Sequence, residues 1–409
     1  MAKTLVVSSR NQASTTTPVH TSLFPNRTSF TVAESTEAIT QRTFRFACTL
    51  SNLYMRIPAN SKTTTSTFLI RVNGANGNST ISMTAGATGE FEDTSNTDSI
   101  SAGDEATFNF SSGSAENITR AVWGCVVDAS SNTTIPLGNG IYSGHMTTAS
   151  ATHFSNITGP SFWDATEANR NFEMRCGGTV ANFQVNVSAN TTSSTTTFGI
   201  RDNGATGNGL ISVTAGATGI FEDNVNTDTI SSGDTLGYYQ TRGTGTGSAN
   251  STYSCEFTTT DSTFPFILSA VTTQTKNAGT TTYESISGGF TASTTETDMR
   301  AEAQFAMTLS NLEIFLTANT ALATSTVRSR IDGADGNQVI SILTLLTGWF
   351  EDTTNSDVVT AAQEINYSTV VGAGGTSIIM TTMGCKATTS AAATTVKDII
   401  QMGLIAFAR

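Results

Sequence analysis

The stretch that decides the fold is Arg71-Val72-Asn73-Gly74-Ala75-Asn76-Gly77-Asn78, because it occurs three times. It returns as Arg201-Asp202-Asn203-Gly204-Ala205-Thr206-Gly207-Asn208 and as Arg330-Ile331-Asp332-Gly333-Ala334-Asp335-Gly336-Asn337, so the two intervals are nearly equal. Solenoid repeats are only about 20–50 residues long, whereas the interval from Arg71 to Arg201 is long enough for a unit that buries a core of its own. The sequence therefore predicts three homologous domains in one chain.

Further segments repeat at the same offsets. Thr88-Gly89-Glu90-Phe91-Glu92-Asp93 matches residues 218–223 and 347–352, and Cys125, Cys255 and Cys385 recur almost in register. We place the units at 1–133, 134–262 and 263–409. The first includes an N-terminal arm, positions 1–23, and the last includes an apolar C-terminal strand within 392–409, which either closes unit 3 or pairs outside it.

Within a unit, short apolar and β-branched runs alternate with turn residues. Residues 65–72 read as a strand that enters the Asn73-Gly74 turn, and residues 79–84 return from it. Asn-Gly is the strongest short-range signal of a β-hairpin, because both positions of a type I′ turn need a positive φ. About eight such strands per unit, with no helical period, predict an all-β protein of three tandem antiparallel β-sandwich domains of the jelly-roll type.

Composition excludes several classes of protein. Charged residues are 13% of the chain, against about 25% in an average domain, and the net charge is −12. Abundant Thr, Val, Ile and Phe argue against disorder, and the acidic balance argues against binding to nucleic acid. No stretch has the ~20 apolar residues of a membrane span. The N-terminus lacks a signal-peptide pattern, so we expect a cytoplasmic origin and free thiols on the five Cys residues.

The sequence offers no catalytic constellation. The three histidines, His20, His145 and His153, do not recur at the repeat offset, so we expect them at surfaces or interfaces. Cys125, Cys255 and Cys385 lack a repeated His partner and are predicted to pack as small core hydrophobes. The two glycines of the repeated loop resemble a phosphate cradle, but strands flank them where such a cradle needs a helix. We therefore predict no enzyme activity and no cofactor.

An acidic segment recurs in all three units. Ca²⁺ prefers about 6–8 oxygen ligands, often from one loop, so calcium is one interpretation of this segment. The other is that Asp and Asn cap turns by accepting hydrogen bonds from nearby backbone. The calcium candidates are Glu92, Asp93, Asp98, Glu222, Asp223, Asp228, Glu351, Asp352 and Asp357.

The order of these motifs (Arg-x-Asn-Gly-Ala-x-Gly-Asn, Ile-Ser, Thr-Gly-x-Phe-Glu-Asp, Gly-Asp before an aromatic strand) resembles Thr-rich jelly-roll repeat modules of tailed-bacteriophage virions. Those modules occur in capsid decoration, head-fibre and tail-fibre proteins. Unit 3 departs from the pattern, because Ala362-Gln363 replaces Gly103-Asp104 and Leu345-Leu346 replaces Gly86-Ala87. We therefore expect unit 3 to make a distinct contact.

The resemblance implies a virion structural protein on the particle surface, assembled in the host cytoplasm. Its partners would be other virion proteins, either the major capsid protein or fibre components, and it would be a homo-oligomer or bound to a lattice. Two alternatives remain open. A host-surface or glycan adhesin predicts exposed aromatics repeated in each unit, for which Trp163 and Trp349 are the candidates. A bacterial surface filament predicts that the purified chain forms homopolymers.

Overall fold

The computed structural model describes residues 2–10, 18–23, 35–116, 118–119, 121–129, 133–140, 151–160, 163–245, 249–261, 265–270, 274–287 and 292–389. The expected C-terminal strand within 392–409, His145 and much of the N-terminal arm lie outside these ranges. Helical structure in the described ranges is confined to three single turns of 3-10 helix, η1 (Glu37–Ile39), η2 (Glu167–Asn169) and η3 (Glu296–Asp298). No helix in this part of the chain is long and apolar enough to cross a membrane.

Unit 1 contains a four-stranded and a five-stranded antiparallel sheet. Its inner sheet has the order β1 (Ala2–Arg10), β11 (Ala121–Ala129), β4 (Cys48–Ile57) and β8 (Gly89–Ile100). Its outer sheet has the order β2 (Val19–Thr21), β9 (Glu105–Ser112), β6 (Ser66–Val72) and β7 (Ala75–Met83). Three short strands complete the unit, namely β3 (Arg42–Thr43) beside β9, and the pair β5 (Ala59–Asn60) and β10 (Ile118–Thr119).

Unit 2 has the same two sheets. The inner sheet runs β12 (Thr134–Gly140), β22 (Ala249–Thr259), β16 (Gly178–Asn190), and then β19 (Gly219–Asp223) and β20 (Asp228–Ile230), which both pair with β16. The outer sheet runs β13 (Thr152–Asn156), β21 (Thr235–Thr241), β17 (Thr196–Asp202) and β18 (Ala205–Val213). Two short strands, β14 (Gly159–Pro160) and β15 (Phe172–Glu173), add to β12 and β21 respectively.

Unit 3 repeats the plan. The inner sheet runs β23 (Pro265–Ala270), β32 (Ser377–Thr389), β27 (Met307–Asn319) and β30 (Gly348–Val359), with β24 (Gln274–Asn277) also on β32. The outer sheet runs β25 (Thr281–Ser285), β31 (Glu364–Val370), β28 (Ser325–Ile331) and β29 (Ala334–Ile342), with β26 (Ala301–Glu302) on β31.

The strand order is that of a jelly roll. If the eight principal strands of unit 1 are counted along the chain, the inner sheet reads 1-8-3-6 and the outer sheet reads 2-7-4-5. Units 2 and 3 have the same order. Two sheets that exchange strands in this way are the double Greek key of jelly rolls. The predicted fold class, three tandem antiparallel jelly-roll sandwiches, is confirmed.

The repeated Asn-Gly motif closes the hairpin between the fourth and fifth principal strands of each unit. In unit 1, Asn73 has φ 50° and Gly74 has φ 76°, and the strands on either side pair from Val72 and Ala75 outward. Two consecutive positive φ angles characterise the type I′ turn that the sequence predicts. The phosphate-cradle interpretation is excluded here because strands flank the turn on both sides.

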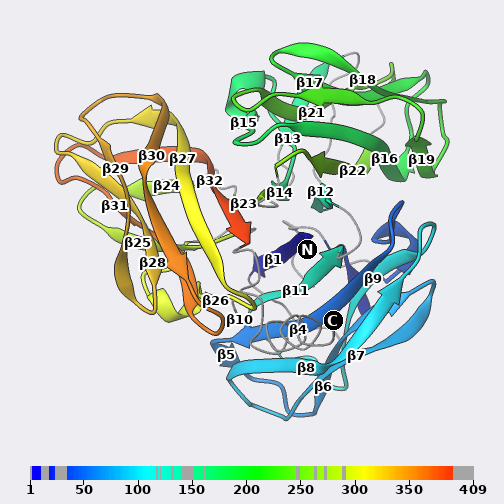
Figure 1. Cartoon of the computed structure of the whole chain (residues 1–409), viewed down its shortest axis with the longest axis horizontal. Helices are drawn as coiled ribbons and strands as arrows, with labels where there is room; N and C mark the ends of the chain where they lie inside the picture. Colours follow the sequence, from blue (N-terminus) through cyan, green and yellow to red (C-terminus); the bar gives the residue numbers. More distant parts are fainter. Residues whose placement is uncertain are drawn as a thin grey trace, which may run out of the picture.

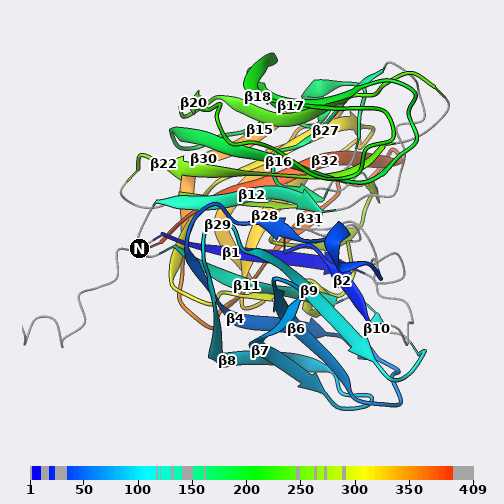
Figure 2. The same cartoon turned by 90° about the vertical axis from the view of Figure 1, so that its right-hand side faces the viewer.

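The three units surround a common centre. In Figure 1, viewed down the shortest axis of the molecule, the first strands β1, β12 and β23 lie close to the centre, and the hairpins of the outer sheets lie at the periphery. Figure 2 shows the side of the ring, where β22 and β12 of unit 2 lie above β1 and β11 of unit 1. Strand β1 contacts both β12 and β23. The chain therefore forms a ring of three jelly rolls with approximate threefold symmetry.

The hydrophobic cores are partly shared between units. Unit 1 has its own cluster, but Tyr54, Val122 and Val126 of unit 1 belong instead to a cluster that runs through units 2 and 3. Each Å² of apolar surface that is buried stabilises the fold by roughly 25 cal/mol, whether it lies inside one unit or between two units. Contact between the units is thus part of the folded core.

Unit 3 holds two non-glycine residues in a left-handed backbone where the other units have glycine. Leu345 has φ 63° and Ala362 has φ 69°, whereas Gly86 and Gly103 occupy the corresponding positions in unit 1 at φ 69° and 101°. A left-handed conformation costs an L-residue roughly 1–2 kcal/mol. The backbone of unit 3 is therefore strained at Leu345 and Ala362, the two positions where its sequence departs from the repeat.

We expect Ala362→Gly to stabilise the protein by about 0.5–1 kcal/mol, because relief of the strain exceeds the added entropy of the unfolded chain. The matched change in unit 1, Gly103→Ala, should destabilise it by a similar amount. Denaturant midpoints of the two variants against the parent chain measure both effects. A loss of stability in Ala362→Gly would show that the backbone at Ala362 is not strained.

Candidate interaction surfaces

The units contact one another head to tail through equivalent residues. Arg45 of unit 1 reaches unit 2, where its Nε donates to Glu222 Oε1 at 3.1 Å. Arg175, its counterpart in the second copy of the repeat, pairs with Glu351 of unit 3. Gln304, the counterpart in the third copy, donates from Nε2 to Glu92 Oε1 of unit 1 at 3.2 Å. One contact is therefore used three times, and head-to-tail contacts that close in this way form a ring.

This contact gives Glu92, Glu222 and Glu351 a role that the sequence interpretation missed. Each glutamate precedes an aspartate of the acidic segment, and successive side chains of a strand point to opposite faces. The glutamates therefore face the neighbouring unit, while Asp93, Asp223 and Asp352 face into their own unit. The signal in the sequence was the recurrence of Arg45 as Arg175 at the repeat offset.

The aspartates accept hydrogen bonds from backbone. Asp98 accepts the N–H groups of Asn78 at 2.5 Å and Ser79 at 3.2 Å, and Asp93 accepts that of Thr80 at 2.8 Å. Although burial alone would raise the pKa of Asp93, donors from Thr80, Asn96 and Ser95 lower it. Asp228 and Asp357 repeat the contacts of Asp98. This geometry fits the turn-capping interpretation.

The second glycine of the motif accommodates this contact. A Cβ on Gly77 would lie 2.4 Å from an oxygen of the Asp98 carboxylate, and Gly207 and Gly336 are similarly close to Asp228 and Asp357. A side chain at these positions would displace the carboxylate from its N–H donors. The tertiary contact thus explains why the motif contains glycine at this position.

The calcium and turn-capping interpretations of the acidic segment predict opposite effects of a chelator. The described residues contain no group of three or more His, Cys, Asp or Glu side chains placed to hold a metal ion. Because N–H donors occupy the oxygens of Asp93 and Asp98, we expect a chelator to leave the melting temperature unchanged. Melting curves with and without EDTA, and with added Ca²⁺, measure this. A fall in melting temperature that Ca²⁺ reverses would assign an ion to the acidic segment.

The five cysteines are all free, as the sequence predicts, and all are buried, which the sequence predicts only for Cys125, Cys255 and Cys385. Burial raises the pKa of Cys48, Cys255 and Cys385 to about 12 and that of Cys176 to about 11. Thiolates are therefore disfavoured, and the reactive form of a nucleophilic cysteine is scarce. His20 corrects one expectation, because it is buried within unit 1 beside Asn109 and not at a surface or interface.

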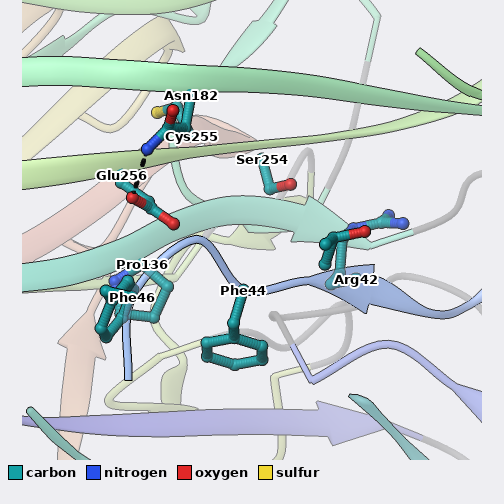
Figure 3. A pocket seen from close by; sticks show the side chains of 9 residues that line it. Arg42, Phe44, Phe46, Pro136, Asn182, Ser254, Cys255 and Glu256 are labelled. Atoms are coloured by element: carbon teal, nitrogen blue, oxygen red, sulfur yellow. Dashed lines mark hydrogen bonds between the residues drawn. The ribbon is translucent and has the colours of Figure 1, made fainter. Parts of the chain in front are cut away.

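A cleft of about 10 Å³, room for about one water molecule, lies where unit 1 meets unit 2 (Figure 3). Arg42, Phe44 and Phe46 of unit 1 line it, and Glu256 on its opposite wall accepts a hydrogen bond from Asn182 at 2.6 Å. Sites for drug-sized ligands are usually about 300–1,000 Å³. Glu256 also accepts the backbone N–H of Arg45 at 2.7 Å, so the cleft is part of the contact between units.

Unit 3 exposes an apolar patch, which we call the leucine patch. It consists of Leu322, Leu343, Leu345 and Leu346, whose exposed fractions are 64%, 58%, 60% and 48%. Asn319 holds it together by donating to the carbonyl oxygens of Leu343 at 3.0 Å and Leu346 at 2.9 Å. In unit 2, Asn190 makes the same bonds at the corresponding turn, where the matching residues are Ser193, Thr214, Gly216 and Ala217.

Units 2 and 3 therefore share the backbone of this turn, and only the side chains of unit 3 make it apolar. Leu345 is exposed and also strained, so it gives the fold neither core burial nor a favourable turn. Contiguous exposed apolar residues on a polar surface are typical of interaction sites. The candidate aromatics do not form such a repeated surface, because Trp163 packs on Tyr253 and the positions matching Trp349 hold Glu90 and Ile220.

No family model matches the chain, and no curated protein matches it. Among solved structures, it is similar to a chain described under "The Triple Jelly Roll Fold and Turret Assembly in an Archaeal Virus", with a TM-score of 0.21 and 12% identity over 85% of this chain and 81% of that one. A chain of Sulfolobus Turreted Icosahedral Virus gives a TM-score of 0.22 and 11% identity over 84% and 79% of the two chains. Likenesses this weak say nothing about what this chain does.

Proposed function

We propose that this chain is a structural protein of a virion, a capsid-surface or fibre component that binds other virion proteins. The observation that carries the proposal is the closed ring of three jelly rolls in a single chain. Such a ring presents three similar surfaces to a lattice, and multivalent attachment makes weak contacts sufficient. The polar, acidic surface favours solubility at high copy number. The leucine patch supplies one contact that units 1 and 2 lack.

Immunogold labelling and negative-stain imaging of particles from cells that make the chain would test this role. We expect label on the particle surface and the chain among the particle proteins in fixed stoichiometry. Label confined to the cell surface, or filaments grown from the purified chain alone, would favour a surface filament. Specific binding on a glycan array, with no particle association, would favour an adhesin.

Variants of the leucine patch sharpen the test. Leu343→Thr with Leu346→Ala installs the residues of unit 2 and should abolish or strongly reduce binding to particles that lack the chain. Val358→Thr also installs a unit 2 residue, at an apolar side chain 72% exposed but at the other end of β30, and should leave binding unchanged. Equal binding by both variants would remove the patch from the proposed contact.

A further inference from the structure

The contact between units 3 and 1 differs from the other two because no peptide joins its sides. Unit 1 leads into unit 2 through residues 130–133, and unit 2 leads into unit 3 through 260–264. We call the third contact the seam. It consists of Asn52, Arg56, Glu90 and Glu92 from unit 1 and Arg300, Glu302, Gln304 and Glu364 from unit 3. The ring can open here without breaking the chain.

The seam holds more acid than base. Arg56 of unit 1 pairs with Glu90 and, across the seam, with Glu364, which also pairs with Arg300. Glu302 lies directly opposite Glu364 in the β26–β31 ladder. Like charges placed in this way destabilise a sheet. Four carboxyl groups therefore share two guanidinium groups.

The surplus carboxyls meet each other across the seam. Glu90 and Glu364 both contact Nη1 of Arg56, so their carboxyl groups lie side by side, and the Glu302 carboxyl lies close enough to that of Glu92 for the two to interact. Two carboxylates cannot hydrogen-bond unless one carries a proton. The groups around Glu302 are Glu92 and Glu90 from β8, Tyr54 and Arg56 from β4, Glu364 from β31, and Arg300 and Gln304 on its own segment, with Glu296 behind Arg300.

We propose that the seam is a proton-operated latch, which is closed while Glu302 and Glu90 hold protons and is loosened when those protons leave. The proposal concerns the chain itself and does not depend on its being a virion protein. It follows from the carboxyl pairs and from the missing covalent link. Because no peptide holds units 3 and 1 together at the seam, repulsion between the carboxylates can separate them.

The direction of the effect follows from the pKa values. Burial, and then the hydrogen bond to Glu92, raise the pKa of Glu302 from 4.5 to about 7, and burial also raises that of Glu90. The closed seam therefore binds more protons than the open one. Its stability is fully present below about pH 4.5 and is lost as the pH rises through about 7.

Hydrogen exchange of the full chain tests the latch. After correction for intrinsic exchange, amides of residues 90–92 and 301–304 should open more as the pH rises from 5 to 7, by up to roughly tenfold per pH unit, and then level off. Amides at the tethered contact of units 1 and 2, residues 42–46, serve as the reference. If the corrected exchange rates of the seam amides do not change between pH 5 and pH 7, the proposal is wrong, regardless of the results with the variants.

Glu302→Gln keeps the shape of the side chain and is permanently neutral. It should remove at least half of the pH dependence of the seam and keep the seam closed at pH 8. The matched control is Glu173→Gln, since Glu173 is the counterpart of Glu302 at the tethered contact of units 2 and 3. The control should leave the seam profile unchanged. An unchanged profile in Glu302→Gln, or an equal loss in the control, would contradict the latch.

Discussion

Replacement of Arg175 by glutamine is expected to destabilise the protein by about 3 kcal/mol at pH 9, where the buried Glu313 carboxyl is ionised and would lose its base. Arg175 donates from Nε and Nη2 to Glu313 Oε2 at 3.1 and 2.8 Å and also pairs with Glu173 and Glu351. The Glu313 side chain is completely buried. Glutamine is the residue that unit 3 uses at the same position, Gln304, so the change preserves the local geometry of the repeat.

The loss should grow with pH. Burial raises the pKa of Glu313 to about 8 even beside Arg175. Without the guanidinium group that pKa rises further. The parent chain therefore stops losing stability near pH 8 whereas the variant continues to lose it, so the gap between them widens above pH 8. Urea denaturation at pH 6 and pH 9 measures the difference.

Arg45→Gln is the control for the Arg175 variant. In its contact the counterpart of Glu313 is Gln184, and the partner of Arg45, Glu222, is only partly buried. Exposed ion pairs contribute little, so we expect a loss of about 1 kcal/mol or less with little pH dependence. Equal losses in the two variants would show that the buried acid is not the source of the effect.

Phe172→Ala is expected to cost about 3–5 kcal/mol, the usual range for truncation of a buried phenylalanine. Phe172 is 1% exposed and its ring lies against Gly384 of unit 3. A Cβ on Gly384 would lie 2.6 Å from a ring carbon of Phe172 and 2.9 Å from the carbonyl oxygen of Leu268. Gly384→Ala should therefore also destabilise the parent chain, by roughly 1–3 kcal/mol.

The double variant separates this contact from general damage. Once the ring of Phe172 is gone, only the contact with Leu268 remains, so Gly384→Ala should cost clearly less in the Phe172→Ala background. A double-mutant cycle on denaturation midpoints gives the coupling between the two positions. Additive losses would mean that the two residues do not interact across the contact of units 2 and 3.

The local structure of each unit could be predicted from the sequence because its signals act over short distances. The Asn73-Gly74 turn, the alternation of the flanking strands and the burial of Cys125, Cys255 and Cys385 depend on φ preference and side-chain period. The role of Gly77 could not be predicted in this way, since it depends on the carboxylate of Asp98 in another strand. The same limit applies to His20, which is buried by long-range packing against Asn109.

The sequence by itself determined that one jelly-roll plan occurs three times, because every copy contains the same turn residues and the same side-chain period in its strands. Only the tertiary structure decided how the copies meet. Position 45 and its counterparts 175 and 304 hold Arg, Arg and Gln, and their partners lie far along the chain in another unit. Such contacts depend on how rigid units approach one another, and a repeat offset shows which positions correspond without showing which ones touch.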